Sequence, residues 1–177
     1  SDFEYAIIPS RRCKHRLPGS GRHDRQGPPL GSGGKRGTQS QAIGRSRGGI
    51  TTKILALTDA LGNLADFRLV PGQAHDLRAV PELIEDLTAD HLLADRAFDA
   101  DWLHAKLADR DIAPVIPPKS NRKFPAAFDK ETYKWRHLIE NYFGKLKENR
   151  GIAMRSCKTD QSFKAFIALA ATVLHLK

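Results

Sequence analysis

The chain has 177 residues, 40% of them hydrophobic, which suits one globular domain with a sizeable core. Its formal net charge of +9 and pI of about 9.8 favour a polyanionic partner such as nucleic acid, although a solvated basic surface gives the same charge. Two cysteines, Cys13 and Cys157, are too few for a disulfide framework and predict a reducing, cytoplasmic location. No apolar run approaches the roughly 20 residues of a membrane-spanning helix.

The N-terminal part changes character after its first residues. Residues 3–8 (FEYAII) predict a short strand. Residues 9–43 are rich in Arg, Lys, Gly, Pro and Ser, so they bury too little apolar surface to order themselves and are expected to be disordered. Cys13, His15 and His23 lie in this segment, but their spacing fits no standard zinc finger.

Strands and helices alternate in the remainder of the chain. Apolar runs flank the turn at residues 59–63 and predict a β-hairpin that ends at residues 71–72. The further predicted elements are a helix at 76–87 that Asp76 caps, a strand at 91–95, a helix at 98–109, a strand at 112–116, and helices at 130–149 and 160–176. This alternation after a hairpin predicts an α/β fold with a mixed sheet.

The long helix at residues 130–149 carries one polar edge. At 100° per residue, Tyr133, Arg136, Glu140 and Lys147 share an arc of about 60°. One interpretation is a solvated face with an Arg136–Glu140 pair that contributes about 0.2–0.5 kcal/mol. The other is a metal-binding carboxylate flanked by phosphate-binding cations. The opposite stripe is apolar and is expected to pack on the sheet: Trp135, Leu138, Ile139, Tyr142 and Leu146.

A second acidic candidate, Asp95, directly follows the predicted strand residues Leu-Leu-Ala. Open α/β sheets hold their sites at the carboxyl ends of strands, so Asp95 is placed for function, although it could equally cap the next helix. Asp99 and Asp101 are expected in the first turn of that helix, where carboxylates have a structural role.

In combination these motifs resemble the DDE-type transposases of the insertion sequence four and five groups. Tyr133, Arg136, Glu140 and Lys147 reproduce the signature Y-x2-R-x3-E-x6-K, and residues 95–98 (DRAF) look like the second signature. Further similar segments are residues 44–49 (GRSRGG), 59–63 (DALGN), 71–76 (PGQAHD) and 116–122 (IPPKSNR). The resemblance runs from about residue 44 to the C-terminus.

The resemblance implies a ribonuclease-H-like catalytic domain over residues 44–177, with residues 1–8 as its first strand. It implies metal-dependent cleavage and transfer of DNA strands, with two Mg²⁺ or Mn²⁺ ions held by three carboxylates. Asp95 and Glu140 would be catalytic metal ligands. The implied partners are transposon ends and target DNA at the nucleoid, bound by a homo-oligomer through Tyr133, Arg136, Lys147, Lys119 and Arg122.

The pattern breaks at the first catalytic aspartate. The family has this residue after a strand that looks like residues 6–8, but here the next residue is Pro9, which has no side-chain oxygen. Residues 9–37 also fail to resemble the family, so we expect a partial and inactive copy whose gene carries a pair of compensating frameshifts or a sequencing error. The alternatives are that residues 9–37 form a basic DNA-binding arm and that the protein is a non-catalytic nucleic-acid-binding domain.

Overall fold

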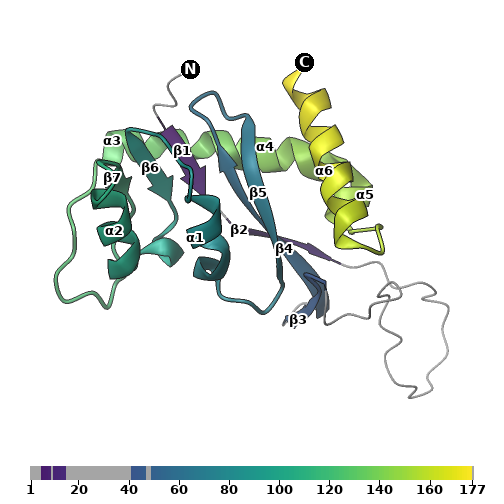
Figure 1. Cartoon of the computed structure of the whole chain (residues 1–177), viewed down its shortest axis with the longest axis horizontal. Coiled ribbons are helices and arrows are strands. Elements are labelled where there is room, and N and C mark those ends of the chain that lie inside the picture. The colour runs from purple at the N-terminus through teal and green to yellow at the C-terminus, as the bar shows by residue number, and fades with distance from the viewer. Residues whose placement is uncertain (1–4, 9, 15–40, 47–48, 177) are drawn as a thin grey trace. The chain divides into compact units, whose positions relative to one another are not determined.

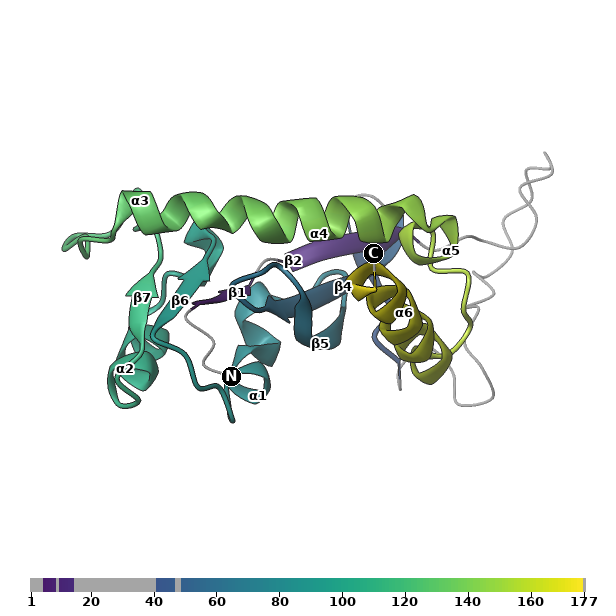
Figure 2. The ribbon, with the colours of Figure 1, turned by 90° about the horizontal axis from the view of Figure 1, so that it is seen from above.

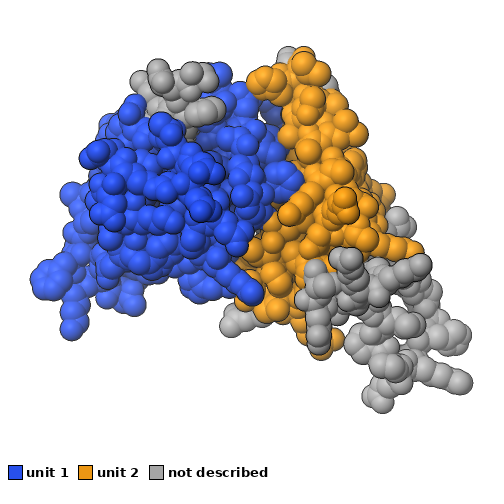
Figure 3. All heavy atoms as spheres, in the orientation of Figure 1, with its two compact units in different colours: residues 1–11, 55–68, 75–145 blue, residues 12–54, 69–74, 146–177 orange. Residues whose placement is uncertain are grey.

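The computed structural model describes residues 5–8, 10–14, 41–46 and 49–176, with side chains in the last two ranges. The chain forms two compact units, shown in blue and orange in Figure 3. Unit 1 comprises residues 1–11, 55–68 and 75–145, and unit 2 comprises residues 12–54, 69–74 and 146–177.

Unit 1 is built on a mixed sheet. The strands of this sheet are β1 (Tyr5–Ile8), β4 (Gly49–Thr58), β5 (Leu64–Pro71), β6 (His91–Ala94) and β7 (Ala113–Val115), paired in the order β5-β4-β1-β6-β7. Of β4 and β5, residues 55–58 and 64–68 belong to unit 1. β1 pairs antiparallel with β4 and parallel with β6, and β6 pairs parallel with β7 (Figure 1). The predicted α/β architecture with a mixed sheet is therefore confirmed.

The central strands are buried on both faces. Leu92, Leu93 and Ala94 of β6 have no exposed surface, and the β4 residues 51–58 are buried throughout. Continuous apolar burial is typical of strands that are covered on both faces. Each buried leucine contributes about 1.5–3 kcal/mol, so β6 is held firmly up to its last residue.

The helices of unit 1 largely follow the predicted ranges. They are η2 (Asp76–Ala79), α1 (Val80–Leu83), η3 (Arg96–Phe98), α2 (Asp101–Ala108), α3 (Lys130–Tyr133), η4 (Lys134–Arg136) and the start of α4 (His137–Glu148). α3, η4 and α4 follow one another directly, as the green rod in Figure 2 shows. The predicted helix at 76–87 is shorter, and its cap is His75, whose side chain accepts a hydrogen bond from the Leu77 amide, rather than Asp76.

Unit 2 contains β3 (Gly44–Ser46), which pairs antiparallel with the start of β4, and the helices α5 (Arg150–Ala153) and α6 (Asp160–His175). Thr159 caps α6 by accepting a hydrogen bond from the Ser162 amide at 3.2 Å. The Arg155 side chain is fully buried in this unit.

Three short elements were not expected from the sequence. β2 (Ser10–Lys14) is a strand inside the segment predicted to be disordered, while residues 15–40 of that segment lie outside the described residues. β3 and α5 are the other two, and both have only three or four residues. None of the helices in the described part of the chain has the length and hydropathy that a membrane crossing requires.

Candidate active site

Asp95 lies directly after the last residue of β6. Its backbone is extended at the N-cap of η3, but its side chain makes no capping hydrogen bond, so the capping interpretation is wrong. The neighbouring Phe98 is fully buried and anchors the turn. β1 and β6 end together because Ile8 is the register partner of Ala94, and Pro9 is the residue that follows Ile8 in the sequence.

Glu140 reaches the same place from the helix α4. Arg136 Nη1 donates to Asp95 Oδ1 at 2.6 Å, and Arg136 Nη2 donates to Glu140 Oε1 at 2.9 Å. The pair between Arg136 and Glu140 expected for a solvated helix face is present, but the guanidinium also contacts a carboxylate on another element. Two acidic side chains far apart in the sequence therefore converge on one cation.

These three side chains are half-buried. The exposed fractions are 38% for Asp95, 41% for Glu140 and 23% for Arg136. Ion pairs at such exposure contribute about 0–1 kcal/mol each to folding, so the geometry is not explained by stability alone.

Tyr133 packs beside this group. Its ring centroid lies 5.4 Å from Arg136 Cζ and 5.6 Å from the Phe128 ring, in an edge-to-face arrangement. Burial raises the pKa of the Tyr133 hydroxyl, an effect that the Arg136 charge partly opposes. The phenol therefore remains protonated at neutral pH and can donate a hydrogen bond.

Trp135 does not join the apolar stripe predicted for the long helix. Its side chain is 51% exposed and stacks on His137, whereas Ile139, Tyr142 and Leu146 of that stripe are buried. The reason is that Trp135 lies in the 3-10 turn η4, where each residue advances about 120° instead of 100°. The face expected for a regular α-helix is therefore displaced at this residue.

Asp99 is a buried acid whose contacts were not expected from the sequence. Its carboxylate accepts hydrogen bonds from the Lys119 backbone amide at 2.8 Å and from Arg122, and it pairs with His104 Nε2 at 2.9 Å. Burial alone would raise the pKa of Asp99, but these hydrogen bonds and the Arg122 charge outweigh it and hold the pKa below the ordinary value of 3.8. Asp99 therefore has a structural role because it binds the loop that contains Lys119 and Arg122, and not because it lies in the first turn of a helix.

The same contacts give two of the predicted DNA-binding cations a structural role. Lys119 Nζ donates to the Asp99 carbonyl oxygen at 2.8 Å, and Arg122 also pairs with Asp101. Lys147 is exposed near the end of α4, in unit 2. Whether these three cations bind DNA stays a prediction.

The Asp95–Glu140 pair fits a divalent cation as two of its ligands. Both residues supply the carboxylate oxygens that Mg²⁺ and Mn²⁺ prefer, and both already share one cationic group. Within the described ranges, no cluster of three or more His, Cys, Asp or Glu side chains could hold a metal ion.

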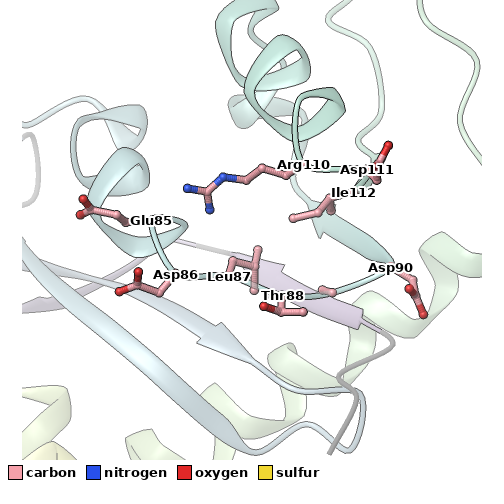
Figure 4. A pocket seen from close by; sticks show the side chains of 9 residues that line it. Glu85, Asp86, Leu87, Thr88, Asp90, Arg110, Asp111 and Ile112 are labelled. Atoms are coloured by element: carbon pink, nitrogen blue, oxygen red, sulfur yellow. The ribbon is translucent and has the colours of Figure 1, made fainter.

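A separate pocket of about 820 Å³ lies at the other end of the parallel strands. Asp90 and Ile112, which directly precede β6 and β7, line it together with Arg110 and the acids Glu85, Asp86 and Asp111 (Figure 4). Arg110 donates to the Ile84 carbonyl oxygen. Active sites of open α/β sheets lie at the carboxyl ends of strands, so Asp95 marks the candidate site and this pocket does not.

Comparisons with known proteins show the family to which the chain belongs. Residues 15–176 match the family model described as the transposase DDE domain, so the match begins within the segment that did not resemble the family by its motifs. A Brucella ovis protein assigned as a transposase for insertion sequence element IS6501 is 36% identical over 130 residues, which cover 72% of this chain and all of that protein.

A solved structure of the piggyBac transposase synaptic complex with hairpin DNA has a TM-score of 0.42 and 14% identity to this chain. The match covers 70% of this chain, which spans 24% of that protein's length. DDE transposases are enzymes that generally use divalent metal ions. On the family match and the identity to the Brucella ovis protein, the chain belongs to the DDE transposase domain family.

Proposed function

We propose that this chain derives from an enzyme that cleaves and transfers the DNA strands of an insertion sequence. The observation that carries the proposal is the convergence of Asp95 and Glu140 on one cation, Arg136, at the carboxyl end of β6. A hydrolytic or strand-transfer site needs carboxylates that share a cation beside a phosphate, and this arrangement provides two of them.

We also propose that residues 44–177, with residues 1–8 as the first strand, form a ribonuclease-H-like fold. Its strand order β5-β4-β1-β6-β7, with a hairpin beside β1 and parallel strands on the other side, supports this proposal. Because β1 and β6 are parallel and end at the same register position, ligands that follow both strands would lie next to one another. The first catalytic aspartate of the family would come from β1 and the second, Asp95, from β6.

In an intact protein of this kind, Asp95 and Glu140 would be ligands of Mg²⁺ or Mn²⁺, with two ions per site. The ions would activate the attacking oxygen and stabilise the leaving oxygen. Asp95 is oriented by the buried Phe98 turn and Glu140 by the buried face of α4. The Tyr133 hydroxyl is a protonated donor next to Arg136, so it suits a phosphate oxygen.

The proposed partner is double-stranded DNA, both transposon ends and target, bound by a homo-oligomer in the cytoplasm at the nucleoid. The net charge of +9 supports a polyanionic partner. Tyr133, Arg136 and Lys147 are the side chains proposed to contact DNA phosphates, together with Lys119 and Arg122. The last two already bind Asp99, so we expect them to contribute less.

We further propose that this copy is inactive because Pro9 follows β1. Proline has no side-chain oxygen, so the metal site lacks one carboxylate and part of its negative charge. The segment 9–37 would result from two compensating frameshifts. The gene tests this directly: translating codons 9–37 in the shifted frame should give an aspartate after Ile8, and the frameshift hypothesis is wrong if it does not.

A cleavage assay tests the function itself. The chain as it stands should cleave a labelled terminal-repeat duplex with Mg²⁺ at no measurable rate. A version in which residues 9–37 are replaced by the shifted-frame translation should cleave it, and Asp95→Asn or Glu140→Gln should then abolish cleavage. Glu148→Gln, the same change at an exposed position of α4, is the matched control and should leave the rate unchanged.

Three outcomes would contradict the proposal. Cleavage by the unaltered chain would show that the third carboxylate is dispensable or comes from elsewhere. A restored chain that binds DNA but keeps full activity after Glu140→Gln would place the chemistry at another site. DNA binding without Mn²⁺ binding or cleavage in any version would favour the non-catalytic nucleic-acid-binding alternative.

A further inference from the structure

The Arg136 guanidinium is bonded to both carboxylates that the proposed function assigns to metal binding. Nη1 donates to Asp95 and Nη2 donates to Glu140, at 2.6 and 2.9 Å. Resting on that proposed function, we propose that Arg136 is the resident counter-cation of the Asp95–Glu140 pair. A divalent cation that binds both carboxylates would compete with it and displace it from at least one of them.

Competition follows from repulsion between two cations that bind the same pair of carboxylates. A divalent ion needs lone pairs of the same carboxylates, at about 2.0–2.1 Å for Mg²⁺. A guanidinium held within hydrogen-bonding distance of both oxygens would then lie within a few ångströms of a like charge. The carboxylates are only half-buried, but two positive groups at such a distance still repel, so binding of one weakens binding of the other.

Arg136 can take up a second position when a divalent cation displaces it from the carboxylates. It is 23% exposed, and its Cζ already lies 5.4 Å from the Tyr133 ring, which can hold the guanidinium face by a cation–π contact. Its five N–H donors then become available for a phosphate, which they can bind in a bidentate manner. Arg136 would therefore couple metal binding to phosphate binding, and such coupling is reciprocal.

Arg122 provides a matched control for this inference. Its side chain is 22% exposed, close to the value for Arg136, and its guanidinium also pairs with two carboxylates, those of Asp99 and Asp101. Replacing either arginine removes one positive charge from unit 1. Only the replacement of Arg136 removes a cation that is bonded to the proposed metal ligands.

The test is direct Mn²⁺ binding to the full chain without DNA, measured at pH 7 from the electron paramagnetic resonance signal of free Mn²⁺. Arg136→Gln should lower the Kd for Mn²⁺ by about fivefold or more, the lower range of coupling between two ligands. Arg136→Met should do the same, and Arg136→Lys, which keeps the charge, should stay near the unaltered chain. Arg122→Gln should leave the Kd unchanged, and Glu140→Gln should raise it.

The outcomes separate this inference from the function on which it rests. If Glu140→Gln weakens Mn²⁺ binding but Arg136→Gln leaves it unchanged or weaker, the metal site stands and the competition is refuted. If Arg122→Gln tightens binding as much as Arg136→Gln, a general charge effect replaces the competition. If none of the variants binds Mn²⁺, the proposed metal site is wrong and this inference falls with it.

Discussion

Two arginines, one in each unit, bridge distant parts of the chain in different ways. Arg155 in unit 2 is fully buried; it pairs with Asp160, donates to Thr52 and to the Ala42 carbonyl oxygen, and stacks on Phe163 at 4.9 Å. Arg136 in unit 1 is partly exposed and donates hydrogen bonds to two carboxylates. A buried guanidinium with mixed acceptors is a structural element, whereas an accessible one between two acids can exchange for another cation.

The largest expected effect is a loss of stability when the buried arginine, Arg155, is replaced. Arg155→Met should lower the free energy of unfolding by about 3–5 kcal/mol, because it leaves the Asp160 carboxylate and the Thr52 hydroxyl without the cation that binds them. Urea unfolding followed by circular dichroism measures this loss. Arg150→Met, at an exposed position on α5, is the control and should change stability by less than about 0.5 kcal/mol.

Asp99 should give the next largest effect, and one that depends on pH. Asp99→Asn removes a buried charge that binds Lys119, His104 and Arg122, so we expect a loss of about 1–3 kcal/mol at pH 7. The folded pKa is held below 3.8, so this stabilisation is present above that pH and is lost as the pH falls through the folded pKa. Unfolding of the unaltered chain and of Asp99→Asn from pH 7 to pH 3 measures the difference between their free energies of unfolding, which should shrink toward low pH.

A constant difference across that range would mean that the Asp99 charge does not hold the loop. Asp109→Asn, at an exposed position just after α2, is the matched control and should show no such trend.

Arg136→Ala should have a smaller effect on folding, in contrast to Arg155. Its two ion pairs are partly exposed, so their loss should cost about 1 kcal/mol or less. The same urea unfolding assay measures it. A loss comparable to that of Arg155→Met would show that Arg136 is a structural element, which would break the comparison.

Tyr142→Phe should have the smallest effect. The buried Tyr142 hydroxyl has no hydrogen-bond partner among the described residues, so its removal should change stability by less than about 1 kcal/mol at pH 7.

Burial raises the pKa of Tyr142 to about 12, so the unfolded chain ionises first and the native chain loses stability above pH 10. The variant has no phenol at this position and should lack this loss. Unfolding at pH 7 and pH 11 compares the two chains, and an equal pH dependence would contradict burial of the hydroxyl.

Much of unit 1 could be predicted from local sequence patterns. The strand at residues 91–94 and, in unit 2, the helix at residues 160–175 follow from apolar periodicity, and the carboxylates Asp95 and Glu140 follow from their motifs. The prediction that Trp135 packs with the apolar stripe was wrong because a 3-10 turn changes the helical period locally. That Arg136 joins Asp95 to Glu140 depends on the packing of α4 near the end of β6, which no local pattern contains.

The rest of unit 2 was less predictable because it also depends on contacts between residues that are far apart in the sequence. The burial of Arg155 depends on acceptors at residues 42, 52 and 160, which only the folded chain brings together. Arginine is usually exposed, so sequence alone favours a surface position. The short elements β2 and β3 are likewise stabilised by pairing with β4 rather than by their own composition.

The most direct test of the central claim uses the paramagnetism of Mn²⁺. In an NMR titration of the chain, substoichiometric Mn²⁺ should broaden the backbone amide signals of Asp95 and Glu140 together, and Glu140→Gln should abolish both effects. Broadening of one signal without the other, or of neither, would contradict the claim that these two carboxylates share a divalent cation.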